Sequence, residues 1–104
     1  MNFFLSIGLL ILTLTIRIHI SGTLRDHRME TISGATILLK TDDQIIDSCT
    51  TDTTGAYSLS FLDVYDKGKE FLFYVVQEPD TFLIYKTDRF ETESPVIDLK
   101  LPDP

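Results

Sequence analysis

The stretch "SGATILLKTDDQIIDSCTTDTTGAYSLSF", Ser33 to Phe61, decides the fold of this chain. Its first and last runs alternate apolar residues with other residues, a period of two that is typical of a strand with one buried face. A middle run lies between these two. The acidic turn TDDQ (Thr41 to Gln44) separates the first run from the middle run, and the turn DTTG (Asp52 to Gly55) separates the middle run from the last. Gly55 ends the second turn, where a positive φ is often required. We therefore predict three consecutive strands joined by tight turns.

The chain on either side of this stretch continues the pattern. Apolar residues alternate from Ile16 to Leu24, and Phe71–Val76 is a continuous apolar run of the kind found in central strands buried on both faces. Seven short strands separated by turn residues predict an all-β fold, an antiparallel β-sandwich with two sheets about 10 Å apart. The predicted strands are 16–24, 35–40, 45–51, 57–61, 71–76, 81–87 and 95–101.

The predicted core follows from the alternation. Residues on the apolar side of each strand should point between the two sheets. This inward set comprises Ile18, Ile20, Leu24, Ala35, Ile37, Leu39, Tyr57, Leu59, Phe61, Phe73, Val75, Ile84, Ile97, Leu99 and Leu101.

Length and charge limit the number of domains and the class of partner. The 104 residues suffice for one domain, and the net charge of −7 comes from 16 acidic and nine basic residues. Nucleic-acid binders concentrate Lys and Arg, so this balance argues against a nucleic-acid partner. No internal repeat or low-complexity segment is visible.

The N-terminal segment differs in composition from the rest. Phe3 to Ile16 is mostly apolar and uncharged, with the length of a signal-peptide core and less than a comfortable membrane span. No Lys or Arg precedes it and no Ala-x-Ala site follows, so a buried first element of a cytosolic domain is the alternative. We predict a signal peptide or N-terminal anchor over 1–15, a β-sandwich domain over 16–104, and a secreted, periplasmic or membrane-anchored location.

The glycines and aspartates of the stretch resemble those of the carboxypeptidase regulatory-like domain, a transthyretin-like (prealbumin-like) sandwich. Three elements of this sequence match the pattern of that family: Gly22, Leu24 and Asp26; Ile32, Gly34, Ala35, Ile37 and Leu39; and Thr51, Asp52, Gly55, Tyr57 and Leu59. The resemblance implies a seven-stranded Greek-key sandwich that accompanies other proteins without chemistry of its own.

Each matched residue also has a structural explanation. Gly34 and Ala35 are small, so a strand can start against a neighbour. Thr51 and Asp52 are expected to bond backbone amides in the turn before Gly55. The stretch is therefore interpreted as scaffold rather than as a chemical site.

The candidates for chemistry are few. His19 falls on the polar side of a strand and His27 in a turn, and neither has metal-ligand spacing from the other or from Cys49. Cys49 is the single cysteine, so no internal disulfide can form; we interpret it as a small buried side chain whose pKa nearby acids raise.

Four aspartates could gather at one end of the fold and bind Ca²⁺, although solvated turn acids are the commoner case. They are Asp42, Asp43, Asp47 and Asp52. A Lys–Asn isopeptide crosslink is not available in the domain, because the only Asn is Asn2. We predict no catalytic, cofactor-binding or metal-binding residue, and no enzyme.

The function expected by elimination and resemblance is a non-enzymatic structural or interaction module of the cell envelope or secreted space. Its protein partner is expected at a sheet edge or on the outward faces of the later strands, where Tyr74, Phe82 and Tyr85 leave aromatic area in water. Two alternatives stay open. One is a transthyretin-type carrier of a small ligand, with a pocket lined by Phe73, Tyr74 or Phe82. The other is an N-terminal accessory domain of a larger outer-membrane receptor.

Overall fold

The computed structural model describes residues 15–64 and 69–103 and shows an all-β fold of seven strands. The predicted leader, 1–15, lies outside the described residues except for its last position. Among the residues described, no helix is long and apolar enough to cross a membrane. The strands are β1 (Thr15–Arg25), β2 (Thr36–Thr41), β3 (Gln44–Thr50), β4 (Ala56–Val64), β5 (Phe71–Gln77), β6 (Asp80–Thr87) and β7 (Leu99–Lys100).

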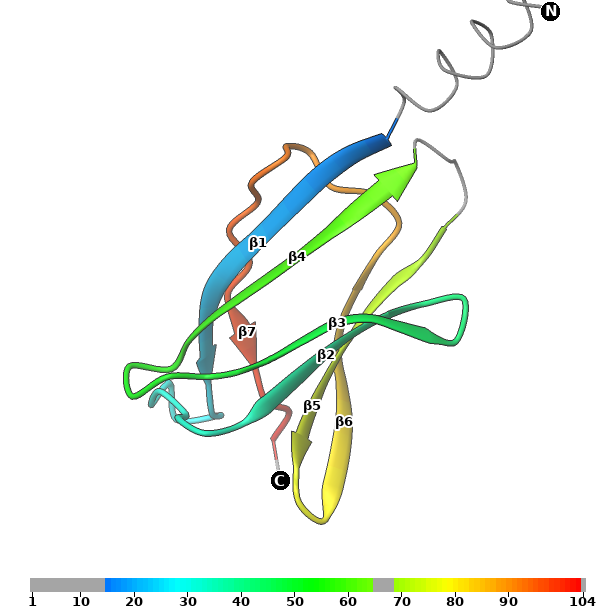
Figure 1. The fold of residues 1–104 in the computed structure, drawn as a ribbon. Coiled ribbons are helices and arrows are strands. Elements are labelled where there is room, and N and C mark those ends of the chain that lie inside the picture. Colours follow the sequence, from blue (N-terminus) through cyan, green and yellow to red (C-terminus); the bar gives the residue numbers. More distant parts are fainter. Residues whose placement is uncertain (1–14, 65–68, 104) are drawn as a thin grey trace, which may run out of the picture.

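The strands form two sheets, one with the order β4-β1-β7 and one with the order β3-β2-β5-β6 (Figure 1). The pairs β1–β4, β2–β3, β2–β5 and β5–β6 are antiparallel. β7 runs parallel to β1, with Leu24 opposite Leu99. The prediction of a wholly antiparallel sandwich is therefore wrong at this strand, because the chain crosses from β6 to the other sheet before it runs alongside β1.

The segment before β7 already lies along β1. The amides of His19 and Ser21 donate to the carbonyls of Glu93 and Pro95, and the Ile97 amide donates to the Ser21 carbonyl. The predicted strand 95–101 is regular only at Leu99–Lys100. Two features shorten it: Pro95 has no amide hydrogen, and the Thr23 amide bonds the Asp98 carboxylate.

The core fills the space between the sheets and contains most of the predicted set. Ile84, Ile97 and Leu101 are only partly buried against it, and Phe71, which was not predicted, is buried. The buried apolar residues are Ile18, Ile20, Leu24, Ala35, Ile37, Leu39, Tyr57, Leu59, Phe61, Phe71, Phe73, Val75 and Leu99.

β5 is a central strand, as predicted, but it is not buried on both faces. Its burial alternates, with Phe71, Phe73 and Val75 buried and the residues between them partly exposed. A two-layer sandwich covers only the inner face of each sheet. The apolar residues on the other face of β5 therefore point away from the core.

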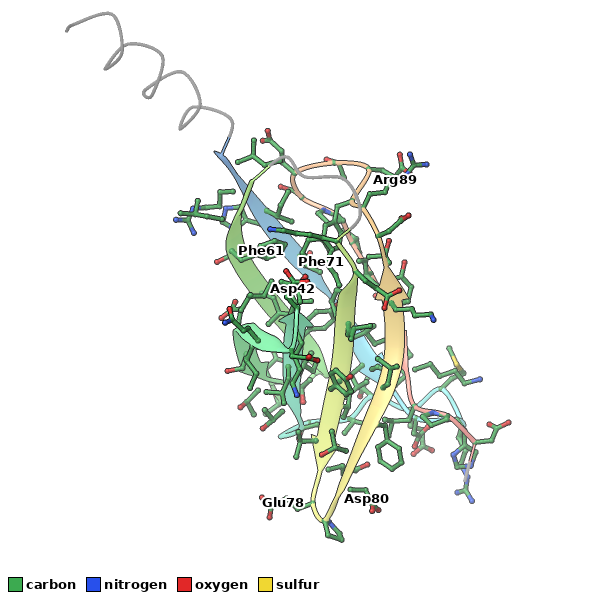
Figure 2. The ribbon with its side chains drawn as sticks, turned by 90° about the vertical axis from the view of Figure 1, so that its right-hand side faces the viewer. Asp42, Phe61, Phe71, Glu78, Asp80 and Arg89 are labelled. Atoms are coloured by element: carbon green, nitrogen blue, oxygen red, sulfur yellow. The ribbon has the colours of Figure 1, made fainter. Side chains whose placement is uncertain are left out.

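Three phenylalanine rings close one end of the core. The ring centroids of Phe61 and Phe71 lie 5.5 Å apart, and Phe90 lies 4.9 Å from Phe71 and 6.0 Å from Phe61. Figure 2 shows Phe61 and Phe71 side by side near this end. The tilted and edge-on arrangements are those that aromatic rings prefer, so the cluster adds to the area burial.

The turns explain most of the polar residues in the stretch from Ser33 to Phe61. Asp42 and Asp43 both have positive φ, 52° and 63°, in the two-residue loop between β2 and β3. Such loops favour Asp and Asn, which tolerate the left-handed region. Asp52 accepts bonds from the amides of Thr54 and Ala56, and Gly55 has φ 78°, as the sequence predicted.

Two details of the predicted scaffold need correction. A side chain at Gly34 would meet no atom within 4 Å, so the position does not require a small residue. It requires glycine because its φ is 74°, in the left-handed region. The Thr51 hydroxyl accepts a bond from the Ala35 amide, so it ties the start of β2 to the end of β3 rather than the turn before Gly55.

Gly22 is required because another segment of the backbone packs directly against it. A Cβ atom there would overlap the Ile97 carbonyl and lie 3.0 Å from the Tyr57 ring. Tyr57 is paired with Gly22 across the β1–β4 ladder, and its hydroxyl donates to the Ile97 carbonyl. The absence of a side chain at Gly22 therefore lets the C-terminal segment pack onto β1 beneath the tyrosine.

Candidate interaction surface

The residues considered for chemistry lie apart from one another. His19 is exposed on β1 opposite Ser60, and His27 is exposed in the turn that follows β1. Within the ranges 15–64 and 69–103, no group of three or more His, Cys, Asp or Glu side chains could hold a metal ion. These positions offer no assembled catalytic or metal centre.

The four aspartates considered for calcium do not gather. Asp42 and Asp43 form the loop before β3, whereas Asp52 follows the far end of β3. Asp47 lies within β3, and its carboxylate accepts a 2.7 Å bond from the Ser60 amide of β4. That bond joins the edges of the two sheets, so Asp47 is a structural residue and the suggested calcium site is wrong.

The perturbed pKa values also have structural causes. The Thr54 hydroxyl and two backbone amides hold the pKa of Asp52 below its usual range. The amides of Glu30 and Arg28 do the same for Asp26 in the loop after β1. Burial raises the pKa of the Cys49 thiol, and the charge of Asp47 adds to this. A raised pKa leaves the thiol protonated and unreactive near neutral pH, as the sequence predicted.

Among residues 15–64 and 69–103, Phe73, Tyr74 and Phe82 do not line a shared pocket of the kind expected of a ligand carrier. Phe73 is fully buried in the core, and Tyr74 belongs to the opposite face of β5. Phe82 borders a hollow of about 300 Å³ together with Leu101 and Gln77. The three aromatic residues proposed to line one pocket therefore do not meet.

The aromatic residues expected to form one contact surface are also divided. Phe82 and Tyr85 pair with Val75 and Phe73, so both belong to the inner side of the β6 edge, although Tyr85 is 40% exposed and leaves aromatic area in water, as predicted. The Tyr85 ring packs edge-on against Phe73, with centroids 5.4 Å apart. Tyr74 alone lies on the outward side.

The outward side of the four-stranded sheet carries an apolar surface that we call the outer face. In its middle row Leu38 pairs with Tyr74, and Tyr74 pairs with Leu83, which is 49% exposed. The residues of the outer face are Thr36, Leu38 and Lys40 from β2, Ile45, Ser48 and Thr50 from β3, Leu72, Tyr74 and Val76 from β5, and Thr81, Leu83 and Lys86 from β6. Half of this set is apolar.

The charge of the outer face differs from that of the chain. Its charged residues are Lys40 and Lys86, which pair with Leu72 from either side, and none of the paired residues on this face is acidic. The Lys40 ammonium lies 5.0 Å from the centre of the Tyr74 ring, a cation–π contact. Glu78 and Asp80 lie at the tip of the β5–β6 hairpin, beyond the rows (Figure 2).

Sequence reasoning did not find the outer face, although a signal was present. The run from Phe71 to Val76 has apolar residues at odd and even positions alike. In a two-layer sandwich one of these two sets has to face away from the core. Leu72, Tyr74 and Val76 form that set.

Comparison with known proteins gives a fold likeness without a family. No family model matches this chain, and neither does any curated protein. The structure is similar to that of the C-terminal domain of the shaft pilin SpaA from Lactobacillus rhamnosus GG, with a TM-score of 0.51. The likeness covers 82% of this chain and 98% of that domain at 13% identity. At this identity the likeness supports the β-sandwich fold alone, and the carboxypeptidase regulatory-like resemblance stays a prediction.

Proposed function

We propose that this chain is a non-enzymatic structural module that makes protein contacts outside the cytoplasm. The observation that carries the proposal is the exposure of large apolar side chains on the strands themselves. Ile45 of β3 and Leu83 of β6, both on the outer face, are 56% and 49% exposed. Apolar surface that remains in water on a rigid sheet is typical of protein interaction sites.

The fold likeness gives weaker support. The similar domain is the C-terminal domain of a shaft pilin. Fold alone does not set function. The likeness therefore agrees with a structural role at the cell surface, and the exposed apolar residues of the outer face carry the proposal.

The finer parts of the proposal come from the sequence. We infer that residues 1–15 act as a signal peptide or anchor, because Phe3 to Ile16 is apolar and uncharged. A transthyretin-like Greek-key topology belongs to the same proposal and rests on the matched glycines and aspartates. The small-ligand carrier finds no support in the described residues, since its pocket residues are dispersed.

Cross-linking on intact cells tests the proposed function. The full-length chain, tagged at its C-terminus, is treated with a membrane-impermeant amine cross-linker, and the products are identified by mass spectrometry. We expect the chain to be labelled in intact cells and joined to one protein in an amount comparable to its own. Labelling that requires cell lysis, or a chain that is recovered only by itself, would contradict the proposal.

A further inference from the structure

The outer face combines two properties that suit a particular kind of partner. Its middle row is apolar from β2 to β6, through Leu38, Tyr74 and Leu83. The adjacent row places Lys40 and Lys86 on either side of Leu72. An apolar centre with flanking charges is the usual composition of a protein interface.

We propose that the outer face docks a partner protein whose own surface is apolar at its centre and carries two carboxylates that meet Lys40 and Lys86. This inference rests on the proposed function and names the surface and the chemistry of the partner. The two lysines are two strand spacings apart, so the partner carboxylates should be about 10 Å apart.

Charge complementarity favours an acidic protein partner over a second copy of this chain or a lipid surface. The chain carries a net charge of −7, yet the paired residues of the outer face include two lysines and no acidic residue. A second copy bound through the same face with its strands parallel to the two-fold axis would bring the lysine row against itself, which is unfavourable. A lipid surface with anionic headgroups would meet Glu78 and Asp80 at the hairpin tip that borders the face. A partner with two carboxylates beside an apolar centre pairs with both lysines without these repulsions.

The lysines are also held in place for such a contact. Lys40 is partly buried and lies over the Tyr74 ring, so less side-chain freedom is lost when it pairs with a carboxylate. Leu83 is half exposed and directly opposite Tyr74. A partner side chain in contact with Leu83 would therefore exclude water from the lysine–carboxylate pairs, which strengthens them.

Zero-length cross-linking tests the proposal. A water-soluble carbodiimide joins lysine amines to carboxylates that they already contact, and it is applied to intact cells that make the full chain. We expect peptides in which Lys40 and Lys86 are joined to Asp or Glu of one other protein. Lys100, exposed on β7, is the internal control and should give few such products.

Two matched variants separate the surface from the fold. Leu83→Asp adds a charge to the outer face, and Leu62→Asp adds the same charge to an exposed position of the other sheet. Leu83→Asp should lower the cross-link yield about tenfold, which corresponds to about 1.4 kcal/mol. Leu62→Asp should leave the yield within about twofold. Equal denaturation midpoints establish that both variants fold.

The outcomes distinguish this inference from the proposed function. Cross-links to a partner at other surfaces, or an equal loss of cross-link yield in both variants, would contradict the outer face as the docking site. The proposed function would still stand. Cross-links of Lys40 and Lys86 to a second copy of this chain, or to lipid carboxylates in place of protein, would contradict the proposed partner. Absence of any partner with both reagents would overturn both proposals.

Discussion

Replacement of Gly22 by Ala should destabilise the sandwich although its backbone conformation is open to any residue. Its φ lies outside the left-handed region, so Gly22→Ala considered by φ alone would stabilise the fold by about 0.4–1 kcal/mol. The structure predicts the opposite sign. The new methyl group would overlap the Ile97 carbonyl, and the C-terminal segment would have to move away from β1.

The magnitude follows from the bonds that this movement would break. They are the Tyr57 hydroxyl bond to Ile97, the bond from the Ile97 amide to Ser21, and the bond from the Thr23 amide to Asp98. Each contributes about 0.5–1.5 kcal/mol net. Alanine also reduces the conformational entropy of the unfolded chain, which offsets part of this loss. We therefore expect the free energy of unfolding to fall by about 2–3 kcal/mol.

Gly34→Ala is the matched control. Gly34 has φ 74° and free space around it, so the variant should lose only the cost of the left-handed conformation, about 1 kcal/mol after the same entropic gain. Urea denaturation of both variants gives the comparison. In the Gly22→Ala background, Tyr57→Phe should have almost no further effect, since the hydroxyl bond is already broken. A Gly34→Ala variant less stable than Gly22→Ala would refute the close-approach argument.

Three further predictions concern the same scaffold. Gly55→Val should lower the unfolding free energy by about 3 kcal/mol in urea titrations, because φ is 78° and the new Cβ would lie 2.8 Å from Thr31; an unchanged midpoint would count against this. Burial raises the pKa of Tyr57, so the stability that the neutral hydroxyl supplies is complete below about pH 10 and is lost as pH rises through the folded pKa. Tyr57→Phe should remove this loss of stability at alkaline pH. Identical pH profiles for the variant and the unchanged chain would contradict this prediction. Asp52 has a lowered pKa, so its contribution is present above about pH 4 and disappears as pH falls through the folded pKa. Asp52→Asn should flatten the acid side of the stability profile, and an NMR titration that gives Asp52 an ordinary pKa would exclude this explanation.

Local patterns were sufficient to predict most of the strands. The alternation around Ile37 and Leu59 and the two-residue loop at Asp42 and Asp43 specify register and turn within a few neighbouring residues, so they can be read from the chain. Gly55 is similar, since the need for a positive φ is local.

Features that depend on distant contacts could not be predicted in this way. The parallel course of β7 depends on where the chain crosses between the sheets after β6. The role of Gly22 depends on Ile97, which lies far along the chain and meets it only in the folded state. The direction of Tyr74 is a further example, because a continuous apolar run does not say which set of residues faces the core.

Competitive lysine labelling tests the central claim most directly. Cells that make the full chain and the purified chain are each treated with a membrane-impermeant amine reagent, and labelling is measured at each lysine. We expect Lys100 to be labelled equally in both samples, and Lys40 and Lys86 to be protected in intact cells about tenfold relative to the purified chain, the reduction expected when about nine in ten chains are bound. Equal labelling of all three lysines in both samples would show an uncovered outer face, and labelling that appears only after lysis would place the chain inside the cell; either result would contradict the account.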